Sequence, residues 1–135
     1  MGAADEHLYE YAVVRYMPRP ERGECVNIGL VMMNKRKRWL KGKIKLVQEK
    51  IRAIHPNADI EYLKKQAALF ERKDVPERDL AIEEKYRWLT AVKSACLQVS
   101  PSHPALLHQP QSSALTDIKD LMEHEFNRLF DSLIL

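Results

Sequence analysis

Three stretches in the first third of the chain show the alternation of apolar and polar positions that is typical of β-strands. They cover residues 8–17, 24–33 and 39–47, and short segments rich in turn-forming residues separate them. The third stretch, WLKGKIKLV, places its leucines and isoleucine on one side and its three lysines on the other. Strands joined by such short connections predict an antiparallel meander.

The remainder of the chain predicts helices and one further strand. Apolar residues spaced by three and four predict helices over 59–72 and 115–133, with Asp59 as the N-cap of the first. We expect another helix over 77–90 and a fourth strand over 95–100. The fourth strand is followed by a predicted loop that carries Pro101, Pro104 and Pro110.

The strand register follows from the same pattern. A slip of one residue turns every side chain to the other face, so the register that gathers apolar residues on one side should be favoured. Even positions of the first three strands are mostly apolar, and we expect them to face the helices. The odd positions would then share a second face, which is either solvated or a docking surface. They are Tyr9, Tyr11, Val13, Arg15, Cys25, Asn27, Gly29, Val31, Lys41, Lys43 and Lys45.

These elements predict one α+β domain over residues 1–135. Its core would be a mainly antiparallel sheet of about four strands, with three helices packed on one face. The length of 135 residues is usual for one domain, and the sequence contains no internal repeat or linker-like tract.

The composition is that of a globular protein, with 45% hydrophobic and 30% charged residues. No apolar run approaches the roughly 18 residues that span a bilayer. Residues 1–7 lack the apolar core of a signal peptide, so we expect a cytoplasmic protein. Cys25 and Cys96 are far apart and outside any C-x-x-C motif, which favours two buried thiols over a disulfide.

Basic residues are concentrated in one place. The net charge is only +3, yet residues 35–45 read KRKRWLKGKIK and contain no acidic residue. Such a run could neutralise nucleic-acid phosphates, with Trp39, Tyr9 and Tyr11 as stacking surfaces. Alternatively, the run is a solvated hairpin turn followed by lysines that protect a strand edge. The nucleic-acid candidates are Lys35, Arg36, Lys37, Arg38, Lys41 and Lys43.

Two motifs carry a resemblance to a known family. The first runs from YEYAVVR at 9–15, through Pro18, to GECVNIG at 23–29. The second is RWLTA at 87–91, which continues through Ser94 and Gln98 to Ser100, Pro101 and His103. Together they resemble a bacterial family catalogued as domain of unknown function 3037. The resemblance implies no activity, but it implies an accessory role beside a HipA-type kinase-fold protein.

The motifs contain polar residues that a minimal fold would not need. They are Arg15, Arg22, Glu24, Asn27, Gln98, Ser100 and His103. Arg15 could hold a carboxylate or phosphate through its planar fork, with Asn27 fixing its orientation. Alternatively, Arg15 pairs with Glu24 to fasten the first hairpin, and Asn27 bonds to backbone.

Three functional hypotheses remain, in order of preference. The first is a non-catalytic interaction module that binds a protein partner through the open sheet face and the turn at 22–24. The second is a nucleic-acid-associated protein that uses residues 35–45. The third is a hydrolase-like enzyme centred on Glu24 and His103, which requires both side chains at one pocket. No nucleophile elbow, phosphate loop or dinucleotide motif occurs, and the five histidines lack ligand spacing, so we expect no metal or cofactor.

Overall fold

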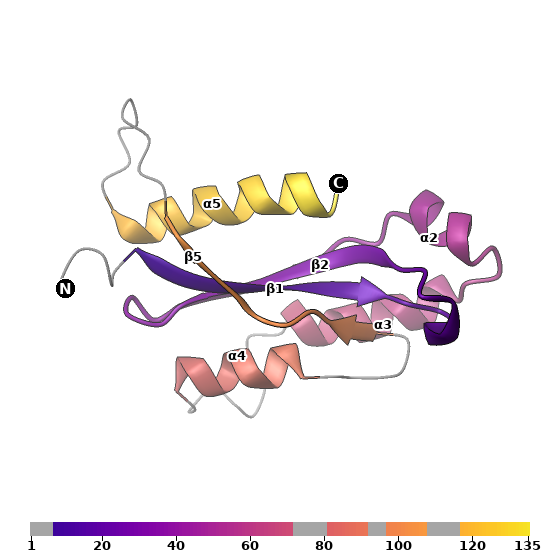
Figure 1. The fold of residues 1–135 in the computed structure, drawn as a ribbon, viewed down its shortest axis with the longest axis horizontal. Coiled ribbons are helices and arrows are strands. Elements are labelled where there is room, and N and C mark those ends of the chain that lie inside the picture. The colour runs from indigo at the N-terminus through magenta and orange to yellow at the C-terminus, as the bar shows by residue number, and fades with distance from the viewer. Residues whose placement is uncertain (1–6, 72–80, 92–96, 108–116) are drawn as a thin grey trace.

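A computed structural model describes residues 7–71, 81–91, 97–107 and 117–135. It shows an antiparallel sheet between helices, which confirms the α+β class (Figure 1). The strands are β1 (Leu8–Tyr16), β2 (Val26–Asn34), β3 (Trp39–Ile44), β4 (Leu97–Val99) and β5 (His103–Leu106). The helices are the 3-10 turn η1 (Pro20–Arg22), α2 (Gln48–Ile54), α3 (Ile60–Glu71), α4 (Ile82–Thr90) and α5 (Ile118–Leu133).

The sheet has the strand order β3-β2-β1-β4, and β5 also pairs with β1. The first three strands form the predicted meander, in which β1 is antiparallel to β2 and β2 is antiparallel to β3. The short helix α2 is absent from the sequence prediction, because its seven residues carry too few apolar positions for a periodic pattern. No described helix is long and apolar enough to cross a membrane.

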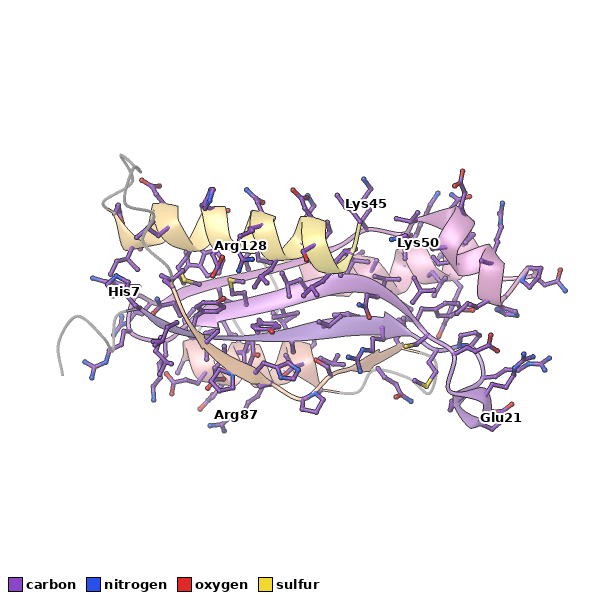
Figure 2. The ribbon with its side chains drawn as sticks, turned by 45° about the horizontal axis from the view of Figure 1, so that its top comes forward. His7, Glu21, Lys45, Lys50, Arg87 and Arg128 are labelled. Carbon is purple, nitrogen blue, oxygen red and sulfur yellow. The ribbon has the colours of Figure 1, made fainter. Side chains whose placement is uncertain are left out.

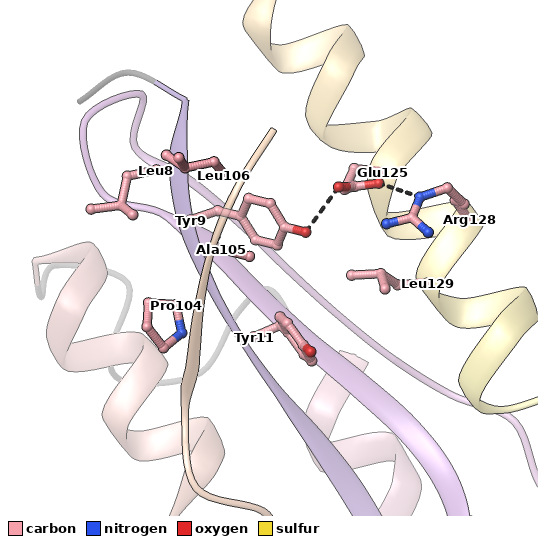
Figure 3. Close-up of a pocket in the computed structure, with 9 residues that line it drawn as sticks. All are labelled: Leu8, Tyr9, Tyr11, Pro104, Ala105, Leu106, Glu125, Arg128 and Leu129. Carbon is pink, nitrogen blue, oxygen red and sulfur yellow. Dashed lines mark hydrogen bonds and ion pairs between the residues drawn. The ribbon is translucent and has the colours of Figure 1, made fainter. Parts of the chain in front are cut away.

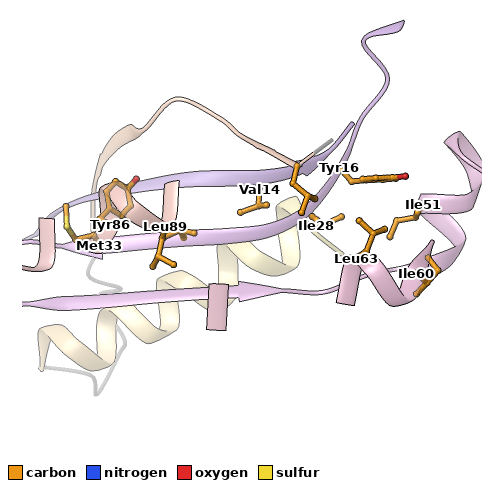
Figure 4. Packing of buried hydrophobic residues seen from close by; sticks show 11 residues of the cluster. Val14, Tyr16, Ile28, Met33, Ile51, Ile60, Leu63, Tyr86 and Leu89 are labelled. Carbon is orange, nitrogen blue, oxygen red and sulfur yellow. The ribbon is translucent and has the colours of Figure 1, made fainter. Parts of the chain in front are cut away.

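Helices cover both faces of the sheet, which corrects the expectation that they pack on one face. Helix α5 lies on one side, and α3 and α4 lie on the other (Figure 1). On the α5 side, the core consists of Tyr9, Val13, Leu30, Met32, Trp39, Leu107, Leu121, Met122, Phe126, Phe130 and Ile134. On the α3–α4 side, it consists of Val14, Tyr16, Ile28, Val31, Met33, Ile51, Ile60, Leu63, Tyr86, Leu89 and Leu97 (Figure 4).

The physical reason lies in β2, whose sequence VNIGLVMMN is almost continuously apolar. A strand of this kind is buried on both faces, whereas a strand with one solvated face alternates. Seven consecutive residues of β2, from Ile28 to Asn34, are buried. The predicted open face is therefore covered by α5 at Tyr9 and Val13, whereas Val31 of the same predicted face lies in the core on the α3–α4 side.

A β-bulge in β2 breaks the odd–even rule. Val14 pairs with Gly29, but Arg15 pairs with Asn27, so Ile28 has no partner opposite it. Ile28 and Leu30 consequently belong to opposite cores although both are even-numbered. A Cβ atom on Gly29 would lie 2.8 Å from the carbonyl oxygen of Lys43, so the close approach of β3 requires glycine here.

Strands β4 and β5 follow one another along the free edge of β1, where the sequence predicted one strand and a loop. β4 pairs with the end of β1 and β5 pairs with its beginning. Ser100 joins the two: its backbone N–H donates to Val13 O at 2.8 Å, and its Oγ accepts from the Val13 N–H at 2.9 Å. The hydroxyl thus replaces a backbone acceptor at the break before Pro101, and proline is tolerated because this strand is at the sheet edge.

Candidate functional site

The motif residues singled out in the sequence lie in three separate places. The connection between β1 and β2 carries Arg22 and Glu24. A row across the sheet contains Arg15, Asn27 and Gln98, which are neighbours in three adjacent strands. The edge formed by β4 and β5 carries Ser100 and His103.

The β1–β2 connection forms one wall of a cleft of about 210 Å³, which we call the turn cleft. Gly23 has a positive φ of 73° and closes η1 through a 3.1 Å hydrogen bond from its N–H to Pro20 O. This tight turn sets Arg22 and Glu24 side by side, with 2.6 Å between Nε and Oε1. Their side chains are 58% and 43% exposed, so the pair stands at the surface. The turn cleft is lined by Pro18, Arg19, Arg22, Glu24, Ile54, His55, Pro56 and Asn57.

The opposite wall of the turn cleft comes from the segment between α2 and α3. His55 Nδ1 lies 2.7 Å from the hydroxyl of Tyr16, and the two rings stack with their centroids 6.2 Å apart. Tyr16 is buried, so this contact anchors His55 to the sheet. With two arginines and one glutamate, the cleft can accept an acidic group and also offers one carboxylate to a basic group.

The row across the sheet serves the fold through Asn27. Arg15 and Asn27 do share a face, as the alternation predicted, because they are directly opposite in the β1–β2 ladder. Asn27 donates from Nδ2 to Leu133 O at 3.2 Å and so fastens the end of α5 to the sheet. The alternative of an ion pair between Arg15 and Glu24 is not supported, because Glu24 pairs with Arg22.

Glu24 and His103 do not meet at a pocket. His103 is opposite Tyr11 in the β1–β5 ladder, and their ring centroids are 5.3 Å apart. Glu24 lies two residues before Val26, which is opposite Tyr16 in the β1–β2 ladder. Tyr11 and Tyr16 are five residue steps apart in β1, so Glu24 and His103 are separated by roughly 17 Å along the strand direction. The geometry provides no support for an acid–base pair made of these two side chains.

The basic run divides into two parts. Residues Lys35 to Arg38 form the β2–β3 turn, in which Asn34 Oδ1 accepts from Lys37 N–H and Lys35 approaches Glu83 at 3.8 Å. Lys41 and Lys43 instead belong to β3 and face α5. Lys41 Nζ lies 2.8 Å from Glu123 and 4.9 Å from the Phe126 ring centre, and Lys43 Nζ lies 4.9 Å from that of Phe130. These two lysines lie at the rim of a core, although Lys43 remains exposed, and the turn presents the exposed residues Lys35, Arg36 and Arg38.

The expectation of buried cysteines is wrong for Cys25, which is exposed. It lies outside β2, immediately before the first strand residue. Cys96 lies outside the described residues.

A larger pocket, of about 540 Å³, lies between β5 and α5 and was not predicted (Figure 3). We call it the α5 pocket, and its lining comprises Leu8, Tyr9, Tyr11, Pro104, Ala105, Leu106, Glu125, Arg128 and Leu129. At one end, the Tyr9 hydroxyl donates to Glu125 Oε2 at 2.9 Å, and Arg128 Nε lies 2.5 Å from Glu125 Oε1. The Glu125 side chain is only 7% exposed, whereas that of Arg128 is 55% exposed.

This arrangement changes the acidity of both partners. Burial, followed by the hydrogen bond to Glu125, raises the pKa of Tyr9 well above its usual range. The hydrogen bond to Glu125 likewise raises the pKa of Arg128. The sequence does contain a signal for this site, because Glu125 interrupts the apolar stripe of α5 next to Phe126. An acidic residue on the buried face of a helix requires a partner.

Metal binding finds no support in the part of the chain that the structure describes. No three histidine, cysteine, aspartate or glutamate side chains are grouped there in a way that could hold an ion.

The chain matches the family described as "Protein of unknown function (DUF3037)" over residues 11–134, a range that contains nearly all of both sequence motifs. No curated protein and no solved structure matches. Because the match covers almost the whole chain, this protein belongs to the family of domain of unknown function 3037.

Proposed function

We propose that this protein is a non-catalytic, cytoplasmic interaction module that binds a protein partner at the turn cleft. The observation that carries the proposal is the ion pair between Arg22 and Glu24 on the rim of that cleft. Exposed ion pairs of this kind typically contribute little to stability, on the order of 1 kcal/mol or less. Folding therefore gives only a weak reason for these two charged residues, and recognition gives a stronger one.

The walls of the turn cleft are suited to hold these charges in place. Gly23 closes the 3-10 turn on one side, and the Tyr16–His55 contact anchors the other. A binding surface that is ordered before association loses less conformational entropy when a partner binds. The partner that fits is a protein surface with an acidic side chain for the arginines and a basic one for Glu24.

The resemblance to the family suggests a HipA-type kinase-fold protein as this partner. We therefore place the module beside such a protein as an accessory subunit. An enzymatic role has less support, since Glu24 lies in the β1–β2 connection and His103 lies in β5, opposite Tyr11.

The test is co-purification and titration calorimetry with a HipA-type kinase-fold protein. Arg22→Glu should weaken binding at least about tenfold, equivalent to 1.4 kcal/mol, because it places a negative charge where the partner is acidic. The matched control is Arg87→Glu on α4, which is the same charge reversal at an exposed position (Figure 2). Figure 2 shows Arg87 and the turn residue Glu21 far apart on the molecule.

A second variant separates recognition from local folding. The double variant Arg22→Glu with Glu24→Arg can keep the ion pair of the turn, but the positive and negative charges exchange places. If the partner recognises this pair, binding stays weak in the double variant. Unchanged affinity in Arg22→Glu, or an equal loss in Arg87→Glu, would exclude the turn cleft as the binding surface.

Nucleic-acid binding through the β2–β3 turn is the alternative. Lys35, Arg36 and Arg38 are exposed there, which is the observation in its favour. Against it, the lysines of β3 are held against α5.

A further inference from the structure

The α5 pocket is separate from the turn cleft and shares no lining residue with it. Its volume of about 540 Å³ falls within the range of small-molecule sites, roughly 300–1,000 Å³. The walls are mostly apolar or aromatic, formed by β1, β5 and α5, and the polar groups gather at one end (Figure 3). This division into an apolar body and one polar end resembles sites that bind amphipathic small molecules.

The polar end offers hydrogen-bond donors rather than acceptors. Glu125 is buried, and its two oxygens are already occupied by Tyr9 and Arg128. Arg128 uses Nε for this contact, and a guanidinium carries four further N–H groups on its outer end. That end is accessible, because the arginine side chain is 55% exposed. A ligand group that binds here must therefore accept hydrogen bonds.

The bond to Glu125 also orients the arginine. A long side chain at a helix surface normally loses rotamer freedom when it grips a ligand. Here the contact from Nε to a buried carboxylate already restrains the guanidinium. A carboxylate is the group whose two oxygens match the planar fork of arginine.

The apolar part of the pocket has a place for a ring or short chain. Tyr11 and Leu129 lie beside the polar end, and Pro104 and Ala105 follow along β5 (Figure 3). Tyr11 is steadied by its contact with the His103 ring, 5.3 Å away. Tyr11 lines the pocket, and its hydroxyl is a group that can donate to a bound acceptor when the ring turns toward it.

We propose that the α5 pocket binds a small apolar molecule that carries a carboxylate. Arg128 and the Tyr11 hydroxyl hold the carboxylate, and Leu129, Ala105 and Pro104 contact the apolar part. Glu125 and Tyr9 are positioning residues, because they orient Arg128 without touching the ligand.

The test is an NMR titration of the full chain with phenylbutyrate, compared with the matched alcohol phenylbutanol. We expect the acid to bind at least about tenfold more tightly, the factor that one charged hydrogen-bonded contact supplies. The amide signals that shift should belong to β1, β5 and the middle of α5. Arg128→Gln should reduce the affinity for the acid to that for the alcohol, while the affinity for the alcohol stays the same.

Two further variants protect the test against misfolding. Tyr11→Phe removes only a hydroxyl. It should lower the affinity for phenylbutyrate a few-fold and leave the affinity for phenylbutanol unchanged. Arg128→Lys keeps the charge beside Glu125 but loses the planar fork. Its affinity for phenylbutyrate should therefore lie between that of the unchanged protein and that of Arg128→Gln. Equal affinity for acid and alcohol, absence of binding at millimolar concentrations, or shifts confined to the turn cleft would each overturn the proposal.

A tripeptide that ends in phenylalanine distinguishes the two sources of such a carboxylate. Tighter binding of the tripeptide with a free carboxylate than of phenylbutyrate would identify the ligand as the C-terminus of a peptide or protein. Tighter binding of phenylbutyrate would assign it to a small acid, and either result supports the site.

Discussion

At the scale of single residues, two buried polar contacts join residues that are distant in the sequence. Tyr9 reaches Glu125, and Ser100 reaches the backbone of Val13. Buried polar groups in folded proteins almost always have such partners, because an unpaired one costs about 1–3 kcal/mol. These contacts therefore bind the two ends of the chain together.

The Tyr9–Glu125 contact predicts how stability depends on pH. In the unfolded chain the tyrosine ionises near its usual pKa of about 10, whereas in the folded protein burial and Glu125 hold its pKa higher. Above about pH 10 the unfolded state thus loses a proton that the folded state retains, and stability falls as the pH rises. Tyr9→Phe should make this fall less steep, measured as the free energy of unfolding in urea between about pH 9 and pH 11.

The matched control for this prediction is Tyr62→Phe, since Tyr62 is 46% exposed. It should lose stability with pH as the unchanged protein does. Part of the fall will remain in Tyr9→Phe, because burial also raises the pKa of Tyr86. If the free energy of unfolding falls equally steeply with pH in Tyr9→Phe and in the unchanged protein, folding does not hinder ionisation of the Tyr9 hydroxyl, and the prediction is wrong.

At the scale of elements, the edge formed by β4 and β5 differs most from the sequence prediction. Prolines within a segment argue against a strand, and Pro101 and Pro104 led to the prediction of a loop. At an edge, however, a proline is tolerated where its nitrogen faces outward. Pro104 is opposite Glu10, at a position between the pairs that exchange hydrogen bonds, so the ladder is preserved.

Ser100 is the residue that maintains this edge, and its removal gives the second prediction. Ser100→Ala leaves the buried Val13 N–H without its acceptor, so the free energy of unfolding should fall by about 1–3 kcal/mol. The control is Ser132→Ala, at an exposed position of α5, which should change stability by no more than about 0.5 kcal/mol. Urea unfolding measures both, and an equally small effect in the two variants would contradict the bridging role of Ser100.

At the scale of the whole molecule, helices cover both faces of the sheet, so partners and ligands can reach the sheet mainly at its ends and edges. The turn cleft is at one end of β1, and the α5 pocket is beside β5, near the other end. The turn that carries Lys35 to Arg38 also lies at an end of the sheet.

This distribution of charge predicts weak contact with nucleic acid. Lys41 pairs with Glu123 and the Lys43 ammonium lies over the Phe130 ring, so these two lysines are less available to phosphates than the residues of the turn. Fluorescence anisotropy with labelled duplex DNA and single-stranded RNA should show little binding at about 0.15 M salt. Tight binding that weakens steeply with salt, and that is lost when Lys35, Arg36 and Arg38 become glutamine, would favour the nucleic-acid function instead.

Much of the architecture was predictable from local pattern. The meander of β1 to β3 follows from period-two alternation and short connections, and α5 follows from its apolar stripe. The position of Arg15 and Asn27 on one face was also predictable, although the bulge at Ile28 means that the simple odd–even rule fails two residues later. A bulge is set by pairing between strands, so alternation within one strand does not reveal it.

The sequence by itself determined the class of fold, the family and the order of most elements, because periodicity and turn chemistry act between near neighbours. The tertiary structure decided which helices cover which face and which polar residues come together. Arg22 and Glu24 are two residues apart and meet in a tight turn, whereas Tyr9 and Glu125 are 116 residues apart and meet only after α5 packs on the sheet. Contacts of the second kind depend on how hydrophobic surfaces are buried across the whole chain, and no local pattern encodes that choice.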